Sequence, residues 1–111
     1  RTKAVSGNCM ENCGGSSGNA PAYVCMFIIA IGDEAVAEGK RSALAYEFGA
    51  QAVLGSAKMV LETGKHPGEL KDMVCSPAGT TIQAVKVLEE TGFRASVMDA
   101  VEACIEKSRS M

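Results

Sequence analysis

The sequence lacks the charge pattern of nucleic-acid-binding proteins and the long apolar run of membrane-spanning ones. Its net charge is -2, and 22% of its 111 residues are charged. Both signs are spread along the chain, so no basic stripe is available for a phosphate backbone. The longest apolar run, Pro21 to Ile31, is shorter than the roughly 20 residues that span a bilayer, and we expect no secretory leader. We therefore expect no nucleic-acid partner, no membrane association and a cytoplasmic location.

Histidine and paired cysteines are also scarce. His66 is the only histidine, and it precedes Pro67, a position more typical of a helix cap or a surface residue than of a catalytic base. The cysteines form an odd, scattered set of five, which argues against a disulfide framework, so we interpret them as reduced thiols: Cys9, Cys13, Cys25, Cys75 and Cys104. Cys9 and Cys13 could supply half of a zinc site, but no second pair accompanies them. We predict no metal site.

The N-terminal stretch offers no recognisable cofactor site. "GGSSG", Gly14 to Gly18, is rich in glycine, but no strand precedes it, as a dinucleotide-binding loop requires. Residues 1–18 have no periodicity, so we expect an irregular N-terminal segment followed by one helical domain over residues 19–111. The start at Arg1 suggests a piece of a longer protein.

Periodicity predicts an all-α fold of about five helices with no β-sheet. Asn19 is a possible N-cap and Pro21 suits a first helical turn. The expected helices run from about Pro21 to Glu38, from Ser42 to Thr63, briefly from Pro67, from Thr80 to Glu90, and from Phe93 to about Glu106. Gly39 and Gly64 are expected to end the first two.

The first two helices have almost no polar face, which makes them hard to bury in so small a monomer. In the second, Ala45, Gly49, Ala52 and Ser56 form a stripe of small residues that would let another helix approach closely, although an ordinary alanine-rich core helix explains it as well. We predict an obligate homodimer.

The segment "CSPAGTTI", Cys75 to Ile82, is the strongest candidate for a functional site. Ser76, Thr80 and Thr81 place hydroxyls at the start of a helix whose first N-H groups have no intrahelical partners. Ala78 and Gly79 leave room for a carboxylate or phosphate to reach those amides. A plain serine or threonine N-cap explains the same residues, and from the pattern alone it is the favoured reading.

The stretch "HPGELKDMVCSPAGTTIQAVKVLEETGFRASVMDAVEA" closely resembles the C-terminal domain of pyrroline-5-carboxylate reductases. "PAYV" and "GSAKMVLETGKHPGELKD" extend the resemblance, which covers about Gly18 to Lys107. The residues that match the family signature in spacing and type are Pro67, Leu70, Val74, Cys75, Ser76, Gly79, Thr81 and Ala84.

The resemblance implies an interlocked helical homodimer, with higher assembly possible, that serves as the dimerisation and substrate-binding domain of the reductase. The whole enzyme reduces 1-pyrroline-5-carboxylate to L-proline, and an N-terminal Rossmann domain, absent from this chain, holds its NADPH or NADH. The chain alone is then expected to bind no cofactor and to be inactive. The alternative is a stand-alone helical dimer that keeps the fold without catalysis.

The resemblance also assigns roles within the loop. The amides around Ser76, Gly79, Thr80 and Thr81 would hold the substrate carboxylate, the Thr81 hydroxyl would face the ring nitrogen as the catalytic group, and Val74 would pack near the ring. Four departures from the family pattern stand out: Asn19 and Ala20 in "SGNAPAY", Ile29 in place of an acid, Lys40 and Arg41 in "GKRSALAY", and Ala78 where glycine is frequent.

Overall fold

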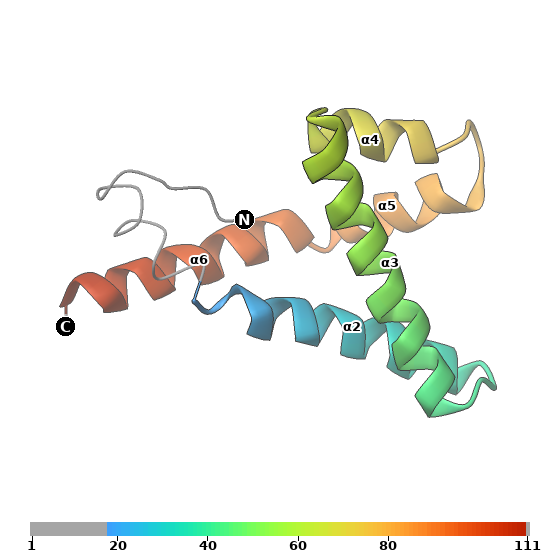
Figure 1. Ribbon diagram of the computed structural model, residues 1–111, viewed down its shortest axis with the longest axis horizontal. Helices are drawn as coiled ribbons and strands as arrows, with labels where there is room; N and C mark the ends of the chain where they lie inside the picture. The colour runs from blue at the N-terminus through green and yellow to red at the C-terminus, as the bar shows by residue number, and fades with distance from the viewer. Residues whose placement is uncertain (1–17, 111) are drawn as a thin grey trace. The chain divides into compact units, whose positions relative to one another are not determined.

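A computed structural model describes residues 18–110, and this part of the chain contains five helices and no strand. They are α2 (Ala20–Ala37), α3 (Ser42–Thr63), α4 (Pro67–Val74), α5 (Thr80–Glu90) and α6 (Phe93–Ser110) (Figure 1). The all-α prediction is confirmed, with small corrections. α2 begins and ends one residue earlier than expected, α6 runs on to Ser110, and the brief turn at Pro67 is an eight-residue helix. The predicted irregular segment lies outside the described residues except for Gly18. The Cys9 and Cys13 pair lies wholly outside them.

Glycines end the first two helices, as the sequence predicts. After α2, Gly39 has a φ of 107°. Its N-H donates to the carbonyl of Val36 at 2.9 Å, and the N-H of Lys40 donates to that of Ala35 at 3.0 Å. This is the Schellman pattern, which satisfies the last carbonyls of a helix and reverses the chain. After α3, Gly64 has a φ of 69° and donates to the carbonyl of Val60.

α2 and α3 form a helical hairpin in which glycine lets the two backbones approach. Figure 1 shows α3 crossing the C-terminal half of α2. The ring of Tyr46 lies directly over Gly32, where a β-carbon would overlap it. The Tyr46 hydroxyl donates a hydrogen bond to Asp33, and this bond raises the pKa of the phenol above its usual value. These contacts of Tyr46 stabilise the packing of α3 against α2 near the C-terminal end of α2.

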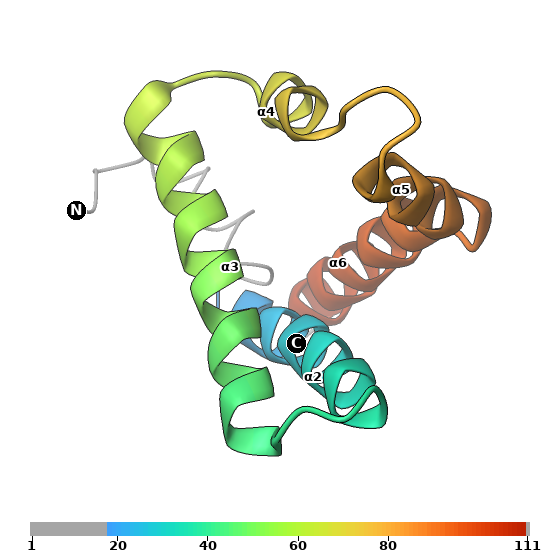
Figure 2. The same ribbon diagram turned by 90° about the vertical axis from the view of Figure 1, so that its right-hand side faces the viewer.

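The stripe of small residues on α3 has the predicted role in its first half only. Ala45 and Gly49 are buried, and a β-carbon on Gly49 would meet Ile28 and Ile31 of α2 at 3.5 Å. Ala52 and Ser56 are exposed, so within the described residues 24–86 the second half of the predicted stripe is not buried as the first half is. The reason is that α3 diverges from α2 along its length (Figure 2).

Gly32 and Gly49 give a matched test of this packing. We expect Gly32→Ala to destabilise the protein by about 1–3 kcal/mol, because the new methyl group displaces the Tyr46 ring. Gly49→Ala should leave stability unchanged or raise it by up to about 1 kcal/mol, since its methyl group makes ordinary contacts and alanine favours helix. Urea unfolding midpoints measure both effects, and equal midpoints for the two variants would contradict the close contact.

Very little of the chain is buried. Ala45 and Leu70 are the buried hydrophobic residues of the described part, whereas twenty large apolar side chains there are exposed. The described residues pack as two units, one formed by residues 24–86 and the other by residues 18–23 with residues 87–110. In the second unit, Tyr23 hydrogen-bonds to Cys104, which raises the pKa of the phenol. A chain with so small a core needs a further surface to stabilise its helices.

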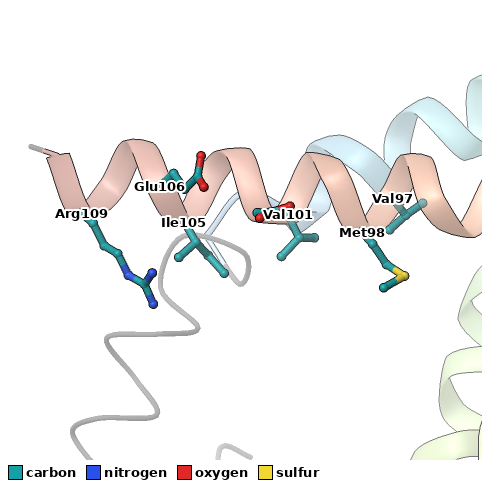
Figure 3. Close-up of a pocket in the computed structure, with 7 residues that line it drawn as sticks. Val97, Met98, Val101, Ile105, Glu106 and Arg109 are labelled. Carbon is teal, nitrogen blue, oxygen red and sulfur yellow. The ribbon is translucent and has the colours of Figure 1, made fainter.

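α6 shows this exposure clearly. Val97, Met98, Val101 and Ile105 project along one side of the helix, with Arg109 near its C-terminal end (Figure 3). Among the described residues, α6 alone lines the open hollow at this face. Met98 is 71% exposed, so the apolar face of the last helix remains available.

The apolar segment of α2 is longer than the run from Pro21 to Ile31 indicates. By length and composition it could cross a membrane, with a mean hydropathy of 1.5 over 18 residues, of which 6% are buried. The difference arises because only the uninterrupted run to Ile31 was counted, whereas the helix continues through Asp33 and Glu34 to Ala37. The absence of membrane association stays a prediction.

Candidate functional site

α4 brings the chain to the candidate loop. Pro67 occupies its first turn, as expected, and the His66 Nδ1 accepts a hydrogen bond of 2.9 Å from the N-H of Gly68. The interpretation of His66 as a helix cap is therefore confirmed. α4 buries Leu70 and ends at Val74, where the N-H of Cys75 donates to the carbonyls of Lys71 and Asp72. A capped helix that is anchored by Leu70 fixes the start of the loop.

Ser76 to Gly79 form a tight turn between α4 and α5, in the loop that joins them in Figure 1. The N-H of Gly79 donates to the carbonyl of Ser76 at 3.1 Å, which closes a four-residue β-turn. Pro77 fixes its own φ near -65°, while Ala78 has a φ of 58°. These are the features of a type II turn, in which the third residue requires a positive φ and is normally glycine.

Ala78 is the only non-glycine residue with a positive φ in the described part of the chain. The left-handed region brings a β-carbon close to the following carbonyl oxygen, which costs about 1–2 kcal/mol. Alanine stands here where glycine is frequent in the family, and the structure shows that this position adopts the left-handed conformation. The loop therefore contains local strain.

Ser76 and Gly79 are in contact across this turn. A β-carbon on Gly79 would overlap the Ser76 hydroxyl and would lie 3.3 Å from the Ser76 carbonyl oxygen. Glycine at position 79 thus allows the serine hydroxyl to lie against the backbone immediately before α5. The arrangement places a hydrogen-bonding side chain beside the start of this helix.

The N-terminus of α5 keeps its first amides available. α4 has a side-chain cap on Gly68, whereas for α5 no hydrogen bond from Thr80 or Thr81 to the preceding loop is found among the described residues. Thr80 is exposed and Thr81 is half-buried. Free N-H groups at the positive end of a helix dipole favour an anion. The geometry therefore departs from a plain serine or threonine cap, which was the favoured reading of the pattern alone.

The sequence from residue 8 to residue 111 matches the pyrroline-5-carboxylate reductase dimerisation family. The chain belongs to this family. The resemblance inferred from "CSPAGTTI" and its surroundings is confirmed, and with it the assignment as the dimerisation domain of a pyrroline-5-carboxylate reductase.

Relatives of the family support the same conclusion. The pyrroline-5-carboxylate reductase of Escherichia coli (strain K12) is 66% identical over 97 residues, which are 87% of this chain and 36% of that protein. The enzyme of Methanosarcina acetivorans is 53% identical over 102 residues, or 92% of this chain and 38% of that protein. The chain thus spans little more than a third of the length of these relatives.

Solved structures of reductases share the fold. The Streptococcus pyogenes 1-pyrroline-5-carboxylate reductase matches with a TM-score of 0.91 and 34% identity, covering 99% of this chain and 42% of that one. The Plasmodium falciparum enzyme, solved with NADP bound, matches with a TM-score of 0.88 and 35% identity, covering 96% and 43%. The helical arrangement is therefore that of the dimerisation domain.

The structure brings together all the predicted loop residues of this reductase domain. Val74 is 60% exposed at the end of α4, Ser76 and Thr80 are exposed, and Gly79 and Thr81 are half-buried. They lie on one short, open segment that leads into α5. Across residues 18–110, no three histidine, cysteine or acidic side chains gather as a metal site would require.

Two polar contacts in the structure have no signal in the sequence. The Tyr46 and Asp33 pair joins residues 13 apart in the chain, and Tyr23 reaches Cys104 from another helix. No local pattern could reveal either pair. The positive φ of Ala78, in contrast, had a readable signal, because proline at the second position of a turn followed by a small residue is typical of type II turns.

Proposed function

We propose that this chain is the dimerisation and substrate-binding part of an NAD(P)H-dependent reductase that converts 1-pyrroline-5-carboxylate to L-proline. The observation that carries the proposal is the family match over residues 8–111, which includes the loop before α5. The reductase names of the E. coli and M. acetivorans relatives agree with it.

The loop supplies the substrate site in this proposal. The carboxylate of the substrate accepts hydrogen bonds from the N-H groups around Ser76, Gly79, Thr80 and Thr81. The positive end of the α5 dipole adds to the attraction. The open geometry of the turn, the small side chains at positions 78 and 79 and the uncapped start of α5 support this role. Val74, exposed beside the loop, packs against the substrate ring.

Thr81 is the residue proposed to act on the reacting atoms. Its hydroxyl faces the ring nitrogen, whose charge and protonation change when the C=N bond becomes an amine. A hydroxyl held at that atom orients the ring and relays a proton. The half-buried position of Thr81 at the start of α5 fits a side chain that is held in place beside the site.

The reducing agent is assigned to another part of the full-length enzyme. NADPH or NADH, held by a nucleotide-binding domain outside this chain, supplies the hydride when bound. NADP is present in the P. falciparum structure. The role of the present chain is to orient the substrate for that transfer.

A second copy of the chain is proposed to cover the exposed apolar helices. Twenty exposed large apolar side chains in the described residues exceed what one small folded unit tolerates in water. Burying α2 and α3 against a partner in an interlocked homodimer stabilises both copies, and further association of dimers is compatible with the faces that remain. We expect such a dimer to be cytoplasmic. Its buried apolar helices would not be available to a membrane, and we expect no nucleic-acid partner.

The proposal is tested by assaying NADPH oxidation with 1-pyrroline-5-carboxylate. We expect the full-length gene product to catalyse it and the 111-residue chain to be inactive and to bind no NADPH. Activity of the isolated chain would contradict this division of labour. A gene that encodes no βαβ unit before Arg1, together with a product that lacks activity, would favour the stand-alone dimer module.

A further inference from the structure

Two contributions of similar size and opposite sign determine how stable the closed turn before α5 is. The single hydrogen bond from Gly79 N-H to the Ser76 carbonyl favours it, while the left-handed backbone of Ala78 opposes it. The net value of one hydrogen bond and the cost of alanine in the left-handed region are comparable. Pro77 and Ala78 are exposed, so packing adds little. The closed turn and a relaxed form should therefore have comparable populations.

From this balance we infer that Ala78 is a positioning residue that sets how often the substrate loop adopts its binding-competent turn. The inference rests on the proposed substrate role of the loop. When Ala78 relaxes to a negative φ, the Gly79 to Ser76 hydrogen bond is lost and the Ser76 hydroxyl leaves the start of α5. The substrate carboxylate then meets an incomplete set of donors.

The consequence is a change of apparent affinity without a change of chemistry. A ligand that binds only the closed turn has its affinity reduced in proportion to the closed fraction. Residues at position 78 that accept a positive φ should strengthen binding, and residues that resist it should weaken binding. Thr81 and the reacting atoms are unaffected once the substrate is bound, so kcat should not change with the residue at position 78.

The test uses Ala78→Gly and Ala78→Val in the full-length reductase. We expect KM for 1-pyrroline-5-carboxylate to fall about twofold with glycine, because an already half-populated turn can gain no more. With valine, KM should rise about fivefold or more, since a β-branched side chain resists the left-handed region further. The value of kcat should stay within about twofold in both, because bound substrate holds the turn closed.

Matched variants separate positioning from general effects on stability. Ala95→Gly changes an exposed alanine in the first turn of α6 and should leave KM unchanged. Ala78→Asn, whose side chain tolerates the left-handed region, replaces the valine variant if that protein does not fold, and should give a KM no higher than the wild type. The thermal midpoint of Ala78→Gly should equal or exceed that of the wild type.

The outcomes distinguish this inference from the proposed function. If the wild-type protein does not reduce 1-pyrroline-5-carboxylate, the proposed function fails, and with it the role of Ala78. If the wild type is active but the variants at position 78 that fold all keep the wild-type KM, or if kcat changes instead of KM, positioning by Ala78 is overturned. A KM that increases from glycine to alanine to valine at constant kcat supports it.

Discussion

In the full-length reductase, Thr81→Ala should lower kcat for 1-pyrroline-5-carboxylate by about 100-fold, the lower end of what a positioned proton-transfer group contributes. The hydroxyl lies at the start of α5, half-buried beside the turn. In the proposed site, its removal would take away the group that orients the ring nitrogen, while the amides proposed to bind the carboxylate would remain. We therefore expect KM to change much less than kcat. Steady-state kinetics of the purified protein measure both.

Two further variants serve as controls for Thr81. Thr81→Ser keeps the hydroxyl and should recover most of the activity. Thr63→Ala removes a threonine whose hydroxyl donates to the carbonyl of Met59 at the end of α3, and it should leave kcat unchanged. Sedimentation should show the same dimer for all three proteins. Wild-type kinetics in Thr81→Ala would remove Thr81 from the mechanism.

The second large effect concerns the dimer. Met26 is 69% exposed on α2, a helix with apolar side chains on every side. We expect Met26→Glu to raise the dimer dissociation constant more than 100-fold, because an unpaired carboxylate in an apolar interface costs at least about 3 kcal/mol. Since the chain buries so little by itself, its helices should unfold as the dimer dissociates. Analytical ultracentrifugation and circular dichroism measure the two events.

A negative charge introduced at a second exposed position distinguishes a loss of the dimer interface from a general effect of added surface charge. Gln51 is an exposed polar residue of α3, and Gln51→Glu should leave both the dimer and its helicity unchanged. A wild-type chain that sediments as a folded monomer at micromolar concentration would show that the exposed apolar helices need no second copy.

The helices and their ends could be predicted because the information is local. Gly39 and Gly64 come just after the last turns of α2 and α3, and Pro67 marks a first turn. Each of these signals acts through the φ that one residue can adopt, so no distant partner is needed to read it. The hydroxyls and small residues of "CSPAGTTI" were visible for the same reason.

The packing of the hairpin could not be predicted in the same way. The stripe from Ala45 to Ser56 looked uniform, yet only its first half meets α2, because the two helices diverge. Gly32 gave no sign that it lies under Tyr46, 14 residues away. A helical pattern shows which residues share a face, but the point where that face meets a partner depends on the crossing geometry.

The sequence by itself determined that this is an all-α chain of the reductase dimerisation family, with helices too apolar to bury in a small monomer and one loop rich in hydroxyls and small residues. Only the tertiary structure decided that Ser76 lies against Gly79 and that Ala78 adopts a positive φ. The physical reason is that composition and spacing limit which conformations are possible, whereas the choice between a capped and an open helix start depends on backbone angles and contacts that form only when the turn closes.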